Sequence, residues 1–469
     1  MNPIEFLRAN RERHHEALCE WIRIPSISAQ PAHAGDVARS ATFLAERLTE
    51  AGLETEIVRT KGHPLVYAER LGAEGAPTLL LYGHHDVQPV DPIDAWKKAP
   101  FEPLVEDGYL LGRGTSDDKG PVYAFVRALE AFHKTTGSLP VNVKVTVEGE
   151  EESGGLGLVE FIRSERDRLA ARAVVVADTP KFSREAPAIC YGLRGIAALE
   201  VRVTGPTQDL HSGGYGGTVE NPAFALAKIL ATCKDDEGRV AIPDFYDDVA
   251  AIPGDERKRM AALGLDEEAW KEETGVPKLH GESGYSAVER RWCRPTFEVN
   301  GIFGGYAGAG SKTIIPRSAG AKISCRLVPD MSPARTLEVV ARHLRRVAPP
   351  TVRVEVELGH SARPVVVRTD GPFVQAAARA LEGAYGKAPV FVREGGSIPV
   401  VNTFHEVLGV DPLLLGLYNP DNRAHSPNER LRLDDFDRAA EAFVRFFEES
   451  GTLGAASSGP RIPSKESNR

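Results

Sequence analysis

Residues of the types that bind metal ions follow three apolar segments that are predicted to form buried strands. The segment 78–83 (TLLLYG) leads to His84, 141–148 (VNVKVTVE) leads to Glu150, Glu151 and Glu152, and 173–177 (AVVVA) leads to Asp178. In open α/β sheets, ligands bind outside the carboxyl ends of the strands. Carboxylates that meet there repel one another unless a positive charge lies among them. The sequence therefore predicts an α/β domain that carries a metal centre, with donors enough for two ions.

The order of the predicted elements divides the chain into two domains. Residues 1–193 alternate helix and strand patterns, as expected for the first part of an α/β domain with a mostly parallel sheet. Residues 194–361 show alternating strands and two helices, which predict an inserted α+β domain. The α/β pattern returns over 362–450, and the Ser/Gly/Pro-rich residues 451–469 are predicted to be disordered. Helices in the first part are predicted over 3–22, 36–52, 119–134 and 156–169.

Charge and composition exclude several classes of protein. The net charge of −9 gives no electrostatic attraction to nucleic acid or to an anionic membrane. No apolar run approaches the roughly 18 residues of a membrane helix, and the first residues read as a capped helix rather than a secretory signal. The five cysteines are scattered and odd in number. We therefore expect free thiols in a reducing compartment and a cytoplasmic protein.

Each candidate segment also has an ordinary structural interpretation. His84 and Asp86 can be a strand-end pair, or Asp86 can orient a metal-bound His84. Asp117, in GRGTSDDKG (112–120), can cap the helix that follows or bridge two metals. Glu150–Glu152 can be a surface charge cluster, but an acidic run that closes a buried strand favours a cleft. There, one glutamate can bind metal while its neighbour acts as general base.

Two motif comparisons limit the chemistry further. The sequence contains no HExxH, and His425 lies in a polar loop (DNRAHSPNE), where a single histidine usually faces solvent. The segment GYAGAGSKT (305–313) has one residue too many between its second glycine and Lys312 for a phosphate-binding loop, so nucleotide binding is not expected.

Taken together, the motifs resemble those of a known family. The strings YGHHDVQPV, GRGTSDDKG, EGEEESGG, DLHSGGYGG, GSKTIIP, CRLVP, REGGSIPV and AHSPNE occur in order along nearly the whole chain. They are similar to the two-metal aminoacylase/carnosinase family of metallopeptidases, and most similar to its cytosolic dipeptidase branch. The implied fold is α/β: a phosphorylase/hydrolase-like, mostly parallel-sheet catalytic domain with an inserted α+β lid and dimerisation domain.

The resemblance implies a role for each residue of the metal centre. His84 would bind the first metal and His425 the second, Asp117 would bridge them, and Glu152 and Asp178 would complete one site each. Glu151 would be the general base on the bridging water, and Asp86 would orient His84. A cis peptide bond is implied between Asp117 and Asp118. Glu150 is expected to take no part.

The resemblance also implies substrate contacts in the inserted domain. His211 would reach the active site of a partner subunit and donate a hydrogen bond to the developing oxyanion. Arg326, with Gly396 and Ser397, would bind the terminal carboxylate of the substrate. His360 and Asn300 match positions near the substrate. The alternative for Arg326 is a salt bridge on the face of a strand.

The predicted function is hydrolysis of dipeptides by a homodimer that binds two divalent ions per subunit. Zn²⁺ is the expected metal, with Mn²⁺ or Co²⁺ as alternatives. Asp178 favours a dipeptidase, because related acylases and carboxypeptidases more often have glutamate at that position. The alternatives are an N-acyl-amino-acid deacylase or carboxypeptidase on the same fold, and a non-catalytic binding protein that has kept the fold.

Overall fold

The structure is a computed structural model that describes residues 1–396 and 398–454. The chain forms two compact units. Unit 1 contains Met1–Tyr191, Val367–Val392 and residues 403–454, and unit 2 contains Gly192–Val366 and Arg393–Asn402. Unit 2 is thus inserted in the sequence of unit 1, and it also includes residues 362–366 and 393–402 of the segment 362–450. Most of the predicted disordered tail, 455–469, lies outside the described residues.

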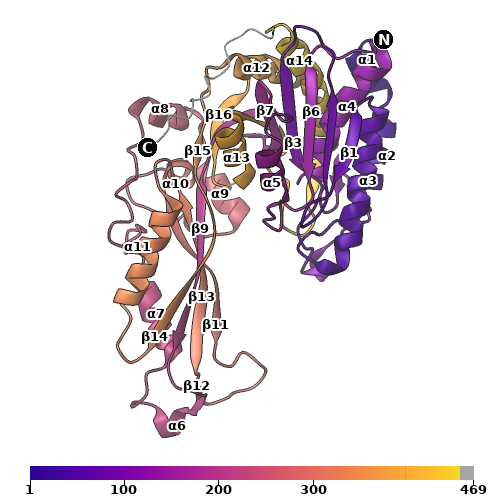
Figure 1. The fold of residues 1–469 in the computed structure, drawn as a ribbon. Helices are drawn as coiled ribbons and strands as arrows, with labels where there is room; N and C mark the ends of the chain where they lie inside the picture. Colours follow the sequence, from indigo (N-terminus) through magenta and orange to yellow (C-terminus); the bar gives the residue numbers. More distant parts are fainter. Residues whose placement is uncertain (397, 455–469) are drawn as a thin grey trace, which may run out of the picture. The chain divides into compact units, whose positions relative to one another are not determined.

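The central strands of unit 1 belong to a nine-stranded mixed sheet (Figure 1). Its order is β1 (Glu54–Val58), β2 (Leu65–Arg70), β6 (Asn142–Glu148), β3 (Thr78–His84), β7 (Ala173–Pro180), β17 (Pro412–Tyr418), β8 (Ala188–Leu193) and β15 (Val365–Val366), with β16 (Val390–Glu394) also paired to β8. Of these strands, β15 and the ends of β8 and β16 lie in unit 2. The neighbours from β6 to β17 run parallel, whereas the pairs at both margins are antiparallel. The α/β class is confirmed, but only the central strands form the parallel sheet.

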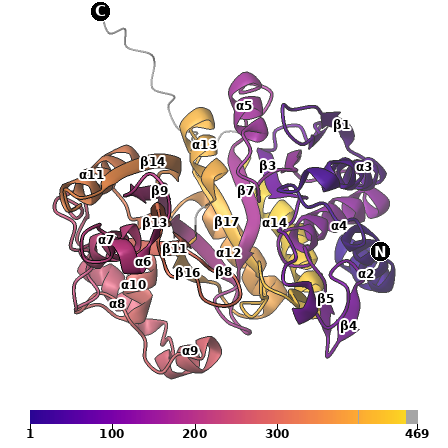
Figure 2. The same cartoon turned by 90° about the horizontal axis from the view of Figure 1, so that it is seen from below.

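Helices cover both faces of this sheet, as expected for parallel strands of continuous apolar sequence. Leu79 and Leu81 of β3 face the larger apolar core, which includes residues of α4 (Lys119–Thr135), α12 (Pro372–Tyr385) and α14 (Leu433–Gly451). On the opposite face, Tyr67 of β2 packs against a phenylalanine of α5 (Gly157–Ser164). Figure 2 shows α5 on one side of the sheet, and α4 and α14 on the other.

The remaining helices of unit 1 follow the sequence prediction with small changes. They are α1 (Pro3–Ala9), α2 (Arg11–Ile22), α3 (Ala34–Glu50) and the end of α13 (Pro399–Leu408). The predicted helix 3–22 is interrupted at Asn10, whose backbone leaves the helical region (φ −107°, ψ 16°). Asn2 and Glu5 form a capping box at the start of α1, in agreement with the capped helix expected there. Among the described residues, no helix combines the length and apolar character needed to cross a membrane.

Unit 2 is an antiparallel sheet with two helices on one face. The sheet order is β11 (Thr296–Gly304), β13 (Ser318–Leu327), β9 (Gly195–Thr204) and β14 (Arg353–Ala362). The helices α7 (Pro222–Ala231) and α11 (Pro333–Arg346) begin after Asn221 and Ser332, whose side chains cap them. Leu226 and Leu344 of these helices share an apolar core with Ile323 of the sheet.

Smaller elements complete unit 2. A two-stranded ribbon joins β10 (Leu210–His211) to β12 (Ile314–Ile315), and the short helix α6 (Ser212–Tyr215) follows β10 directly. The charged segment 235–295 contains α8 (Gly254–Ala262), α9 (Glu267–Thr274) and α10 (Ala287–Cys293).

Candidate metal centre

The candidate metal centre lies where neighbouring parallel strands of unit 1 end. His84 is the last residue of β3 and pairs in register with Glu148, the last residue of β6. Asp178 belongs to β7, on the other side of β3. Because these three strands are adjacent and parallel, their carboxyl ends bring His84, Asp178 and the loop after Glu148 to one edge of the sheet.

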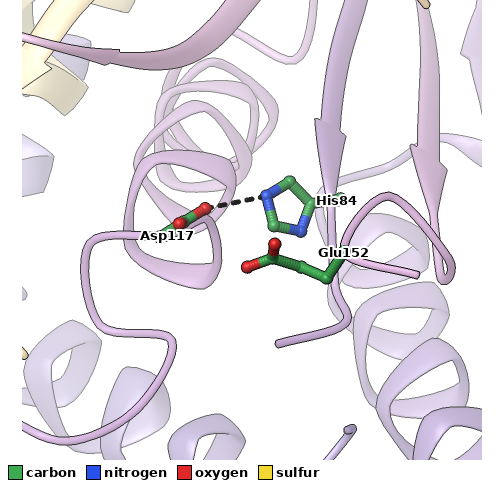
Figure 3. Close-up of side chains that lie close together, drawn as sticks. All are labelled: His84, Asp117 and Glu152. Atoms are coloured by element: carbon green, nitrogen blue, oxygen red, sulfur yellow. Dashed lines mark hydrogen bonds and ion pairs between the residues drawn. The ribbon is translucent and has the colours of Figure 1, made fainter. Parts of the chain in front are cut away.

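His84 is buried and held through both ring nitrogens. Its Nε2 lies 2.9 Å from Oδ1 of Asp117, and its Nδ1 lies 3.1 Å from the carbonyl oxygen of Asp86 and 3.4 Å from Oδ1 of the same residue. Burial lowers the pKa of His84, but hydrogen bonds with Asp117 and Asp86 outweigh it and raise the pKa well above its usual value. Figure 3 shows the side chains of His84, Asp117 and Glu152 directed toward one another.

His425 approaches the other oxygen of Asp117. Its Nε2 is 2.9 Å from Oδ2 of Asp117 and 3.5 Å from Oε2 of Glu152. His425 itself has a positive φ of 61°, an uncommon conformation for a residue with a side chain. Hydrogen bonds with Asp117 and Glu152 raise the pKa of His425 to about 10. The two oxygens of Asp117 therefore each face a different imidazole.

Asp178 and Asp118 complete the group around His84. Oδ2 of Asp178 is 4.0 Å from Nε2 of His84, and the donor atoms of His84, Asp118 and Asp178 lie within 4.8 Å of one another. Asp118 was not predicted as part of the site. Its Oδ2 accepts a hydrogen bond from the backbone N–H of His84 at 3.2 Å, while its buried Oδ1 has no hydrogen-bond partner among the described residues.

Crowded acidic groups raise one another's pKa at this edge. Burial, and then the charges of Asp118 and Asp117, raise the pKa of Asp178 well above its usual value. Burial also raises the pKa of Glu151 to about 8, with Glu152 contributing and His84 opposing. A cation among these carboxylates would reverse the effect by favouring their charged forms.

Asp86 connects His84 to the loop that carries Glu151 and Glu152. Its carboxylate accepts the backbone N–H groups of Glu151 (3.2 Å) and Glu152 (3.0 Å) and the hydroxyl of Ser28 (2.5 Å). Asp86 therefore fixes the backbone of both glutamates as well as the ring of His84. Among the described residues, Glu152 also accepts a hydrogen bond from Nε2 of Gln88 at 2.6 Å. Neither Ser28 nor Gln88 was predicted from the sequence.

The fully buried carboxylate of Glu429 organises the loop before Asp117. It accepts backbone N–H groups of Gly114 (2.9 Å), Ser116 (2.8 Å) and Asp117 (3.1 Å), and Nη1 of Arg113 at 2.9 Å. Glu429 follows His425 by four residues. Its side chain therefore connects the loop that carries His425 to the loop that carries Asp117. The peptide bond between Asp117 and Asp118 is cis, as the family resemblance implied.

Glu150, in contrast, has a structural role. Its carboxylate accepts the backbone N–H groups of His63 (3.2 Å) and Gly157 (2.6 Å), the latter at the start of α5. Both carboxylate oxygens of Glu150 are thus engaged with backbone N–H groups rather than with the metal-facing residues. This agrees with the expectation that Glu150 is not a ligand.

The donor set fits divalent metal ions. Two imidazoles and several carboxylates converge, all five cysteines lie elsewhere as buried free thiols, and the carboxylates outnumber the cations among them. Nitrogen and oxygen donors of this kind suit Zn²⁺, Mn²⁺ or Co²⁺.

The predicted substrate residues lie in unit 2. His211 precedes α6, and its Nδ1 accepts the backbone N–H groups of Gly213 (3.0 Å) and Gly214 (3.2 Å). Arg326 alternates with the core residues Cys325 and Leu327 on β13, so its half-buried side chain lies on the sheet face opposite the apolar core.

The other predicted substrate residues are more exposed. Asn300 sits at an irregularity of β11, and His360 at one of β14. The carbonyl oxygen of Gly396 accepts the backbone N–H of Arg194 at 3.1 Å. Ser397 lies outside the described residues.

Comparison with known proteins places this centre in a family. The sequence model of peptidase family M20/M25/M40 matches residues 80–449. This chain belongs to that family. The resemblance of its motifs, stated from the sequence, is confirmed.

Three relatives show how far the similarity extends. The chain is 34% identical to the Cys-Gly metallodipeptidase DUG1 of Candida albicans, over 90% of this chain and 91% of that protein. A crystal structure of human carnosine dipeptidase 1 matches with a TM-score of 0.87 and 30% identity, over 96% of this chain and 98% of that one. An M20 family metallo-carboxypeptidase of Sulfolobus solfataricus matches with a TM-score of 0.85 and 33% identity, over 94% and 99% of the two chains.

Proposed function

We propose that this protein hydrolyses the peptide bond of dipeptides with a centre of two divalent metal ions. The observation that carries the proposal is the position of Asp117, whose two oxygens each lie 2.9 Å from a different histidine. A carboxylate so placed can bridge two ions, one beside His84 and one beside His425. In this proposal Asp178 completes the first site and Glu152 the second. The relatives named as dipeptidases support the substrate class.

Glu151 is the proposed general base. Bound divalent ions lower the pKa of a coordinated water from 15.7 toward about 7 and polarise a carbonyl group. Glu151 accepts the proton of the attacking water and delivers it to the leaving amine. Asp86 holds the backbone N–H of Glu151 and so fixes where this proton is taken up. Glu151 would be ionised, as a base requires, when the positive charge of bound ions lies beside it.

His211 is proposed to donate a hydrogen bond to the developing oxyanion. Because its Nδ1 accepts two backbone N–H groups, the ring proton of the neutral side chain resides on Nε2. That nitrogen is then a donor. We propose a homodimer in which His211 of each subunit serves the active site of the other.

We propose that Arg326, Gly396 and Ser397 bind the terminal carboxylate of the substrate, with Asn300 and His360 close by. A guanidinium binds a carboxylate through two parallel hydrogen bonds. A clamp that acts on one substrate together with the metals would limit substrate length, which favours dipeptides over longer peptides.

A direct test is metal-dependent hydrolysis of a panel of free dipeptides, tripeptides and N-acyl amino acids. The protein is stripped with a chelator and reloaded with Zn²⁺, Mn²⁺ or Co²⁺, which also identifies the most effective metal. Cleavage of dipeptides with a free amino terminus is expected. The similarity to the Sulfolobus carboxypeptidase favours one competing function. Release of C-terminal residues from blocked or longer peptides would establish that function instead, and cleavage only of N-acyl amino acids would establish a deacylase.

The roles of single residues need matched variants. Glu151→Gln is expected to keep both metals, measured by elemental analysis, and to lose at least 10²-fold in kcat. Glu160→Gln, an exposed position on α5, is the control. Normal turnover of Glu151→Gln with metals bound would show that another group is the base.

Subunit mixing tests the shared active site. Glu151→Gln and His211→Asn homodimers are each expected to be inactive. Mixed dimers contain one site with both wild-type residues, so activity should return to about a quarter of the wild-type value when subunits exchange at random. Inactive mixtures, with exchange verified, would place His211 and Glu151 of the same subunit in one site.

A cytoplasmic location is part of the proposal. All five cysteines are free and buried, and burial raises the pKa of Cys233 and Cys293 to about 11. Such thiols need no oxidising compartment. Fractionation of cells that express the tagged protein checks this.

A further inference from the structure

Unit 2 contains a positively charged cavity that shares no residue with the proposed metal or substrate sites. Its volume is about 340 Å³, and its walls come from the strand β11, the 234–240 turn, α9 and α10. The segment 235–295, which has no part in the proposed hydrolysis, supplies most of them. The cationic side chains in the lining are Arg194, Lys234, Arg290, Arg291 and Arg294.

Acidic partners in the lining are too few to neutralise this charge. Glu282 accepts two hydrogen bonds from Arg294, both at 2.7 Å, and Glu298 lies 3.0 Å from Lys234. With His280 neutral, the lining carries three more positive than negative charges. The carboxylate of Glu394, which is 3.0 Å from Arg291, reduces the surplus to two.

Arg290 is the cation best placed to bind a ligand. Its Nε donates to the carbonyl oxygen of Glu282 at 2.9 Å, and its stem packs on Gly281. Among the described residues, no carboxylate lies within ion-pair distance of its guanidinium. These contacts hold the aliphatic part and Nε of Arg290 in place. Its terminal guanidinium nitrogens can therefore bind an anion.

Arg194 links the cavity to the turn at Gly396. Its Nε donates to the carbonyl oxygen of Gly395 at 2.9 Å, and its backbone N–H donates to that of Gly396. Burial, and then the charges of Arg326 and Arg291, lower the pKa of Arg194 to about 10. Guanidinium groups gathered at this density repel one another, and an anion among them would relieve the repulsion.

We propose that this cavity is a binding site for a small oxyanion, a carboxylate or phosphate group. Planar guanidinium groups bind such anions through paired hydrogen bonds. Trp270 also lines the cavity, and the centroid of its ring lies 5.4 Å from the guanidinium carbon of Arg291. The anion can come from the acidic side chain of a substrate or from a free ion. The site itself does not depend on the proposed hydrolysis.

The first experiment titrates the metal-free, full-length protein with inorganic phosphate and with succinate at constant ionic strength. The fluorescence of Trp270 reports binding, and Trp270→Phe identifies its share of the signal. A saturable change is expected, and Arg290→Gln should weaken binding about tenfold because a charged hydrogen-bond donor is lost. Arg259→Gln, on exposed α8, is the control and should bind as the wild type does.

Opposite changes of charge make the test independent of general damage to the fold. Lys234→Gln should weaken binding several-fold, and Glu298→Gln should tighten it, because these two partners contribute opposite charges to one cavity. Changes in the same direction for both variants, or an equal response to potassium chloride alone, would overturn the proposal. Absence of a saturable response to both anions would also overturn it.

The source of the anion is identified by hydrolysis. If the substrate supplies it, Arg290→Gln should raise KM for a dipeptide ending in Glu about tenfold more than for one ending in Gln. If a free ion occupies the cavity, Arg290→Gln changes the two KM values together and still weakens phosphate binding about tenfold. A protein that binds phosphate but hydrolyses no dipeptide would contradict the proposed function and leave this site established.

Discussion

Replacing Glu429 by Gln tests whether the metal centre depends on a carboxylate that itself touches no metal-facing side chain. Oε1 accepts the N–H groups of Ser116 and Asp117, and Oε2 accepts those of Gly114 and Arg113. Glutamine has one accepting oxygen, so its NH₂ group must face two of the four donors. Either orientation leaves two buried donors without a partner and removes the charge opposite Arg113.

The expected magnitude follows from these contacts. Arg113 is 1% exposed, and breaking a buried ion pair by removing one partner typically costs about 3–5 kcal/mol. Two orphaned donors at about 1–3 kcal/mol each give a similar figure. The loss acts on the loop that ends at Asp117. Supporting contacts of this kind change metal affinity by about 10–100-fold when they are removed.

The assay measures two quantities on the same variant. Urea unfolding of the metal-free protein gives the loss of stability, and competition with a chromophoric chelator gives the affinity for Zn²⁺. Asp437→Asn is the matched control, because it removes the carboxylate opposite another buried arginine of unit 1, Arg127, at 3.0 Å. Both variants should lose stability, but only Glu429→Gln should lose metal affinity.

Two results would refute the reasoning. Wild-type Zn²⁺ affinity in Glu429→Gln would mean that the loop holds Asp117 in place without this carboxylate. An equal loss of affinity in Asp437→Asn would mean that metal binding follows overall stability, so that Glu429 has no specific part in it.

Three further predictions concern the surroundings of the centre. Burial raises the pKa of Glu148 and Glu151 to about 8 from 4.5, so the folded, metal-free protein holds protons that the unfolded chain releases as pH rises through this interval. Its melting temperature should therefore fall from pH 5 to 8.5, with a smaller slope in Glu151→Gln, and an identical slope in that variant would contradict the assignment. Ser28→Ala removes a hydrogen-bond donor to Asp86 and should lower kcat by a factor that corresponds to about 1 kcal/mol, with a smaller effect on KM. An unchanged kcat would show that Asp86 is held in place without Ser28. Lys119→Met leaves the buried carbonyl oxygen of Trp21 and the part-buried one of Ile24 without their donor. It should cost about 1–3 kcal/mol for each in urea unfolding, whereas wild-type stability would show that water replaces the amine.

The sequence predicts the strand-end half of the centre for a physical reason. His84 and Asp178 follow apolar runs of adjacent parallel strands, and parallel strands end at a common edge. Asp117 and His425 come from loops, where no periodicity fixes a position. Their approach to one another was expected only from the family motifs.

Residues that support the centre were missed because their function lies in the backbone contacts they accept. Glu429 follows the histidine of AHSPNE, but nothing in its spacing shows that it will meet the N–H groups of Ser116 and Asp117, more than 300 residues earlier. Asp118 was missed for the same reason. Asp117 was predicted as a ligand, whereas Asp118 accepts a hydrogen bond from the backbone N–H of His84. The predicted helix 156–169 also ended too late. The structure ends α5 at Ser164, although the charged residues that follow are compatible with a helix.

The acidic edge of the sheet carries more negative charge than its own residues can neutralise. Asp178 and Glu151 have raised pKa values because burial and neighbouring carboxylates disfavour their ionised forms. An ordinary core would exclude such groups, since each buried carboxyl costs free energy unless it is paired. Here, the backbone hydrogen bonds to Asp86, Asp118 and Glu429 hold the group together without neutralising it. The fold thus fixes the geometry of the donors in advance. Bound metal ions would supply the missing charge, and their binding would then stabilise unit 1 and favour the ionised form of Glu151 that the proposed reaction needs.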